Sequence, residues 1–134
     1  MLIVDPREVS FGSATWGRVT SVAIERRAAK SFAEYGADGP HVVLADVPEQ
    51  RVEVTVVQEL LADDMDAPVP GELAELSFET ALNSSSSGRK TVSMDAVVLG
   101  VKYAVSRKSG SVRTVELLAV SSDGSADPVR VVGA

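Results

Sequence analysis

Apolar and polar residues alternate along much of the chain, and a period of two is the pattern of half-buried β-strands. The clearest example is residues 51–60, where Val52, Val54 and Val56 face one way and polar residues face the other. In residues 73–80, Ala74, Leu76 and Phe78 are expected to point inward in the same manner. The predicted strands cover residues 19–26, 42–47, 51–60, 73–80, 91–105, 112–120 and 129–132.

The longest predicted strand, residues 91–105, changes its apolar face partway along. Its early apolar residues are Val92, Met94 and Ala96, and its later ones are Val97, Leu99, Val101, Tyr103 and Val105. The phase of the alternation therefore flips near residues 97–99. Such a flip indicates a β-bulge, a strand that passes from one sheet to another, or burial on both faces.

The remaining segments are dominated by turn-forming residues, with little predicted helix. Residues 28–35 are compatible with two helical turns or with a long excursion between strands, and residues 60–66 with one helical turn or a loop. Residues 1–8 are predicted to form an extended N-terminal arm. The predicted loops are a serine-rich, flexible one at 83–90, a hairpin turn at 107–111 and a turn cluster at 121–128.

These patterns predict an all-β fold of about seven strands, a sandwich or a barrel, with at most one or two short helices and long loops. The 134 residues suit a single domain spanning 1–134. No internal repeat or interdomain linker interrupts them.

The composition argues against most catalytic chemistry. The chain has no cysteine and a single histidine, His41, which excludes disulfides, zinc–thiolate sites and sites that need two imidazoles from one chain. No Gly-x-Ser-x-Gly elbow is present. We therefore expect no enzymatic activity, no cofactor and no metal. No apolar run approaches the roughly 18 residues of a membrane span, and the N-terminus lacks a secretory pattern. Synthesis in the cytoplasm and no membrane contact are the expectation.

Charge is distributed in three blocks, although the net charge is −6. Residues 31–88 contain twelve acidic residues and one basic residue, whereas residues 1–30 and 89–134 are net basic. The acidic total disfavours specific nucleic-acid binding, which usually needs basic surfaces. Opposite charges on different parts of one chain favour association between copies. The alternative is a solvated acidic region without a partner.

Two sets of residues are candidates for function on this basis. The candidate subunit contacts are Arg26, Arg27, Lys30, Tyr35, Asp38, Arg89, Lys90, Arg107 and Lys108. The outward acids of the predicted strands are Glu53, Glu59, Glu75 and Glu79. These acids either keep the surface soluble or line a lumen that repels DNA from its wall.

Several segments together resemble phage tail-tube and related tail structural proteins. They are Asp5-Pro6 after a short arm, the strand at 17–26, the loop at 35–39, the strand at 51–60 and the late hairpin ending at 113–118. The resemblance implies a small β-domain that assembles into rings, commonly hexameric, with strands of adjacent copies forming an inner barrel. Rings would stack into a tube around a tape-measure protein, alongside other tail proteins, and later around DNA that passes without specific binding.

The resemblance also implies a location in the virion tail and carries over no catalytic residues. Tube proteins usually have a clear amphipathic helix, and only the short segments 28–35 and 60–66 offer one here. A tail-end or baseplate component is therefore an alternative to the tube itself. A second alternative is a monomeric β-sandwich module that binds carbohydrate or another protein.

Overall fold

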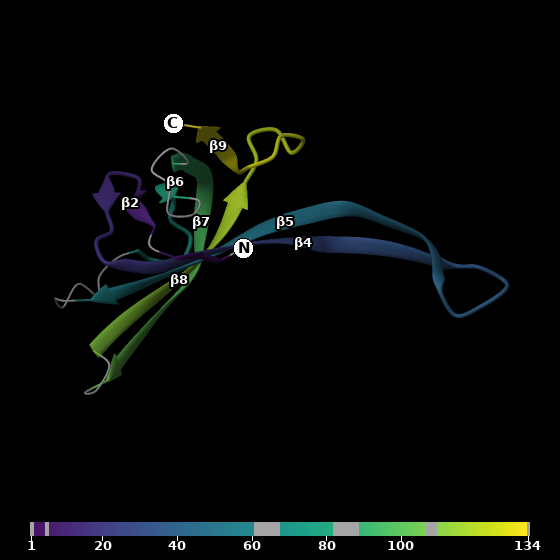
Figure 1. Ribbon diagram of the computed structural model, residues 1–134, viewed down its shortest axis with the longest axis horizontal. Helices are drawn as coiled ribbons and strands as arrows, with labels where there is room; N and C mark the ends of the chain where they lie inside the picture. The colour runs from purple at the N-terminus through teal and green to yellow at the C-terminus, as the bar shows by residue number, and fades with distance from the viewer. Residues whose placement is uncertain (1, 5, 61–67, 82–88, 107–109, 134) are drawn as a thin grey trace.

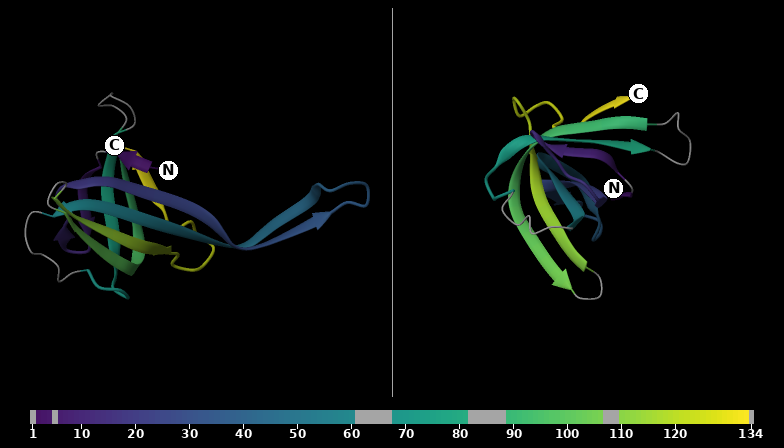
Figure 2. Two further views of the ribbon diagram at one scale, coloured as in Figure 1. Left: turned by 90° about the horizontal axis from the view of Figure 1, so that it is seen from below. Right: turned by 90° about the vertical axis from the view of Figure 1, so that its left-hand side faces the viewer.

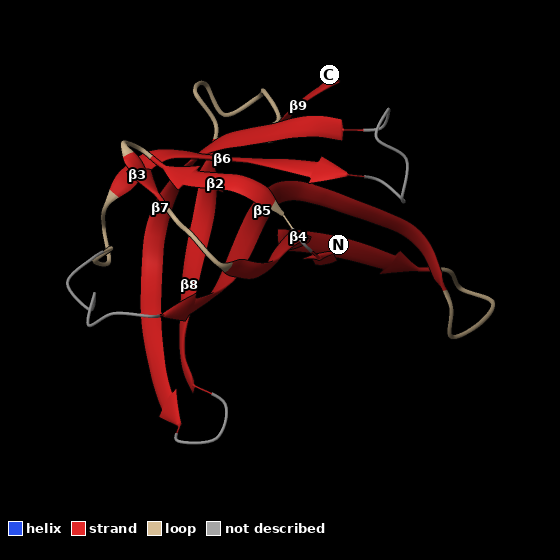
Figure 3. Ribbon diagram, turned by 60° about the vertical axis from the view of Figure 1, so that its left-hand side comes forward, coloured by secondary structure: helices blue, strands red, loops and turns tan. Residues whose placement is uncertain are grey.

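All described elements are antiparallel β-strands (Figures 1 and 3). The computed structural model describes residues 2–4, 6–60, 68–81, 89–106 and 110–133, and these ranges contain no helix. The strands are β1 (Leu2–Val4), β2 (Arg7–Phe11), β3 (Ala14–Thr15), β4 (Val19–Tyr35), β5 (Val42–Leu60), β6 (Leu73–Ala81), β7 (Arg89–Ser106), β8 (Gly110–Val120) and β9 (Arg130–Gly133). The predicted all-β class is confirmed.

The strands form one sheet in the order β1-β4-β5-β8-β7-β6-β2-β3, with β9 added on β7. The sheet curls strongly but does not close into a barrel. Its N-terminal strands separate at Pro6, because β1 pairs with β4 and β2 pairs with β6 at the other side of the sheet. The predicted extended N-terminal segment, residues 1–8, is thus divided between β1 and β2, on opposite sides of the sheet.

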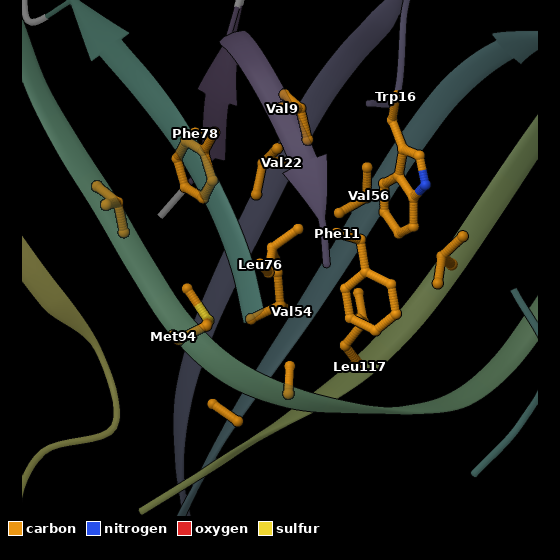
Figure 4. Close-up of a cluster of buried hydrophobic side chains, with 14 of the residues drawn as sticks. Val9, Phe11, Trp16, Val22, Val54, Val56, Leu76, Phe78, Met94 and Leu117 are labelled. Atoms are coloured by element: carbon orange, nitrogen blue, oxygen red, sulfur yellow. The ribbon is translucent and has the colours of Figure 1, made fainter. Parts of the chain in front are cut away.

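The core lies inside the curl, where β2, β6 and the first half of β7 face β4, β5 and β8 (Figure 4). Val52, Val54 and Val56 are buried, as their alternation predicts, and so are Leu76 and Phe78. Burial of such side chains is the main favourable term in folding. The remaining buried apolar residues are Val9, Phe11, Trp16, Val22, Val92, Met94, Ala96, Val98, Val115, Leu117 and Ala119.

The apolar flip in β7 is explained by a β-bulge. The pairing of β7 with β8 shifts register between Val98 and Gly100, so Leu99 is the extra residue. Before the bulge the even-numbered residues are buried. After it, Val101 pairs with the buried Val115 and Tyr103 with the buried Arg113. The extra residue therefore keeps apolar side chains on the inner face of the sheet.

The helical alternative for residues 28–35 is wrong. This segment continues β4 and pairs with the first half of β5, for example Phe32 with Asp46 and Ala33 with Ala45. An eight-residue helix is marginal by itself in water, and pairing with a neighbouring strand overrides a weak helical preference. Most of the other helical candidate, 60–66, lies outside the described residues, as does the predicted loop 83–90 up to residue 88; its last two residues, Arg89 and Lys90, begin β7 instead.

Candidate interaction site

The most distinctive feature is a two-stranded ribbon that projects from the body of the sheet (Figures 1 and 2). We call residues 28–50 the arm; it comprises the end of β4, a turn and the start of β5. Within the described residues, β1 pairs with β4 only at 21–23, and β8 pairs with β5 only from Val52 onward. Both outer edges of the arm are consequently unpaired there. Eight residues of extended strand, such as 28–35, span roughly 25 Å.

The arm exposes large apolar side chains. Those at least two-fifths exposed are Phe32, Tyr35, Val42, Val43, Leu44 and Val47, and Val43 reaches 69%. All arm residues except Gly36 are exposed. An isolated two-stranded ribbon is marginally stable in water, and unpaired apolar edges promote association with another chain. The arm therefore combines exposed apolar side chains with two unpaired strand edges.

An ion pair fastens the base of the arm to the loop between β8 and β9. Nη1 of Arg26 lies 3.1 Å from Oδ1 of Asp127, and Nη2 lies 3.1 Å from Oδ2. The backbone N–H of Val129 also donates to Asp127, at 3.0 Å. These donors, Arg26 first, lower the pKa of Asp127 below its ordinary value. The contact restrains the arm where it leaves the body.

A second acid organises the same loop. The Oδ1 atom of Asp123 accepts hydrogen bonds from the backbone N–H groups of Ala126 and Ser125, both at 2.9 Å. These two bonds lower the pKa of Asp123. The loop at 121–128 is therefore an ordered turn with its own hydrogen bonds, as its Ser/Asp/Gly composition favours.

Five of the predicted contact residues lie along the hairpin that forms the arm and its base. Arg26 and Arg27 lie at the arm base, and Lys30, Tyr35 and Asp38 lie on the arm. Lys90 is exposed at the start of β7, on the far side of the sheet from the arm. The side chain of Arg89, together with Arg107 and Lys108, lies outside the described residues.

The four predicted lumen-facing acids occupy the outer face of the sheet, opposite the core. They form two pairs, because Glu53 and Glu59 are on β5 and Glu75 and Glu79 are on β6, with β8 and β7 between. Glu53 forms an ion pair with Arg51 at 3.0 Å, and a nitrogen of Arg130 lies 3.4 Å from Glu75. Their role in lining a lumen stays a prediction.

A hollow of about 310 Å³ lies where the inner face opens beside Trp16. The guanidinium of Arg113 lies 5.0 Å from the centroid of the Trp16 ring and donates to the Gln58 side chain. Gln58 in turn donates to the carbonyl of Gly17 at 2.7 Å. The ring centroids of Phe11 and Trp16 lie 5.3 Å apart. Because these groups are engaged with one another, they close the end of the core rather than offer an open ring to a sugar or base.

Two exposed apolar residues of the arm, Val43 and Leu44, were missing from the predicted contacts, which included Tyr35. Val43 and Leu44 belong to an apolar run, residues 42–44, that does not alternate. A run of this kind is ordinarily the mark of a buried strand. In the structure the run is instead exposed on the arm.

No model of a known protein family matches the chain, and no curated protein matches it. The described part of the chain contains no helix long and apolar enough to cross a membrane. Within the same residues, no group of three or more histidine, aspartate or glutamate side chains is placed to hold a metal ion.

Proposed function

We propose that the protein is a structural subunit that assembles with its own copies into rings, and that the rings form a tail tube of a phage or a phage-derived particle. The observation that carries this proposal is the arm. It extends an apolar ribbon with two open edges into solvent, and a second copy supplies both the apolar surface and the strand edges that would cover it.

The chemistry of the body supports a structural role over a catalytic one. The hollow beside Trp16 is lined by Trp16, Gln58 and Arg113, whose side chains are engaged with one another. The segments that resemble tail-tube proteins include the strands at 17–26 and 51–60, which form the body ends of β4 and β5. Acidic residues on the outer face and a net charge of −6 suit a wall that DNA slides past without binding.

The assembly is tested by measuring the native mass of the protein by light scattering over a range of concentrations, with negative-stain images of the same samples. We expect multi-subunit particles that appear as rings with a central opening, or as tubes. The informative variant replaces residues 31–48 with Asn-Gly, a sequence suited to a two-residue hairpin turn between Lys30 and Glu49, which pair in the parent chain.

This shortened variant should remain folded, because every buried core residue lies outside 25–51. Its thermal unfolding midpoint should stay within a few degrees of the parent value, while its mass falls to that of a monomer. A parent chain that stays monomeric at all concentrations would contradict the proposal. So would a shortened variant that still forms the particles.

The alternative of a monomeric binding module makes the opposite prediction in the same experiment. Such a module would be monomeric with the arm intact, and the arm would engage a foreign partner. A tail-end component would form one ring size without stacking, and the negative-stain images separate that outcome from a tube.

A further inference from the structure

A second open strand edge lies at the other end of the molecule from the arm (Figure 1). β6 pairs with β7 only as far as Val97, and β9 pairs only with 90–93. From Gly100 to Ser106, β7 has β8 as its sole partner strand within the described residues. Val105 on this stretch is 76% exposed, the most exposed large apolar side chain of the described chain. We call Gly100–Val105 the β7 edge.

The arm and the β7 edge carry opposite charge. The arm, residues 28–50, contains four acidic residues and one lysine, Lys30, whereas the β7 edge contains Lys102 and no acid. Lys102 is the described base on the β7 edge, and it is exposed. Opposite potentials of this kind steer association and set its register. The two surfaces cannot meet within one molecule, because the arm and the β7–β8 hairpin point away from each other (Figures 1 and 2).

Of the two edges of the arm, the β4 edge is suited to pairing. The β5 side contains Pro48, which has no N–H to donate. It also contains extra residues that shift its register against β4 twice, once between Glu49 and Asp46 and once between Leu44 and Val42. Residues 30–35 of β4 have neither a proline nor an inserted residue. They match the six residues of the β7 edge in length.

Side-chain alternation makes one alignment consistent in both charge and apolarity. Paired residues on adjacent strands share a face. If Glu34 pairs with Lys102, its neighbours Ala33 and Tyr35 fall on the face of β7 that carries Val101 and Tyr103. The same contact then joins an opposite-charge pair on one face, and on the other it places the exposed Tyr35 beside the half-buried side chains of Val101 and Tyr103.

We infer that the arm of one copy adds its β4 edge to the β7 edge of the next copy, with Glu34 beside Lys102. This inference rests on the proposed self-assembly and names the contact that produces it. The contact is head-to-tail, because the two surfaces differ, so repeated use of it generates a closed ring or an open filament. Backbone hydrogen bonds supply its affinity and the side chains its register.

Cysteine cross-linking tests the contact directly, because the parent chain contains no cysteine. Directly paired residues have Cβ atoms roughly 4.5–5.5 Å apart, close to disulfide range. Glu34→Cys and Lys102→Cys proteins are prepared separately, mixed and oxidised. We expect a covalent dimer on a non-reducing gel from the mixture and not from either variant alone. The matched control mixes Glu34→Cys with Lys90→Cys, an exposed lysine on the other half of β7, and should give no dimer.

The outcomes separate this inference from the proposed function. Particles of normal mass without the covalent dimer overturn the contact and leave self-assembly standing. A dimer from Glu34→Cys alone shows arm-to-arm pairing and also overturns it. A parent chain that remains monomeric removes both.

Exchanging the charges at positions 34 and 102 tests the pairing of Glu34 with Lys102 independently of cross-linking. Lys102→Glu should weaken association about fivefold, the effect of one exposed charge pair, with further loss from the new repulsion. Adding Glu34→Lys to the same chain should return association to within about twofold of the parent. Failure of the second change to rescue the first would contradict the pairing of these two residues.

Discussion

Single residues in this protein divide into those that the alternation places correctly and those that only the fold explains. Val54 and Leu76 lie on predicted inward faces and are fully buried. Arg113 is also buried, although charged residues are rarely found inside. Its position depends on Gln58 and Trp16, which are distant in sequence, and no local pattern could have indicated that group.

The Arg26–Asp127 ion pair makes stability depend on pH in the acid range. The folded pKa of Asp127 is lowered from its ordinary 3.8, so the pair stabilises the protein above that value and the contribution disappears as pH falls through the lower folded pKa. Because both side chains are about half exposed, Asp127→Asn should cost at most about 1 kcal/mol at neutral pH.

Urea unfolding of the parent and Asp127→Asn proteins at neutral and acid pH measures this dependence. The gap between the two should close in acid. Asp38→Asn, a change at the exposed tip of the arm, serves as the control and should leave stability unchanged at both pH values. A gap that persists in acid would contradict the assignment to Asp127.

At the level of elements, the sequence predicts the long body strands well, but it misses β2, β3 and the part of β4 that lies on the arm. The strand at 51–60 is predicted from its alternation, and the apolar flip near 97–99 correctly signals a bulge. Residues 28–35 lack that alternation because neither face of the arm meets a core. Periodicity reports one-sided burial, so a strand exposed on both faces leaves little trace of it.

The bulge at Leu99 predicts a large effect of a single deletion. Removing Leu99 would turn the side chains of β7 from Gly100 to its end toward the opposite face of the sheet, because the side-chain period of a strand is two. Val101 and Tyr103 would then turn outward, and Lys102 would turn toward the core end. We expect a loss of several kcal/mol, comparable with removing a large core side chain, measured by chemical unfolding.

Leu99→Ala is the comparison that separates register from side-chain loss. Leu99 is 46% exposed, so this substitution should change stability by less than about 1 kcal/mol. Equal effects of the deletion and the substitution would show that the register of β7 does not depend on the extra residue.

At the scale of the whole molecule, charge and topology act together. The arm is net acidic, and the β7 edge, which carries Lys102, lies at the opposite end of the structure. The sequence shows this division as blocks of charge. It does not show which blocks are far apart in space, because that depends on the order of strands in the sheet.

The electrostatic part of the proposed assembly predicts a dependence on salt. Screening shortens the reach of exposed charges to about 3 Å at 1 M salt, so association should weaken as salt is raised from about 0.1 M. Native mass by light scattering across that series measures the effect. Particles whose mass and concentration dependence ignore salt would indicate that apolar and backbone contacts alone hold them together.

The pairing of β2 with β6 affects the order in which the strands can form during synthesis on the ribosome. Residues 7–11 cannot form their strand pairing until residues 76–79 have been synthesised. β9 follows later in the chain and pairs with the first half of β7. The β4–β5 hairpin pairs two strands that are adjacent in sequence, and hairpins of this kind form within microseconds. During synthesis the β4–β5 ribbon can therefore form before the strands that complete the core have been made.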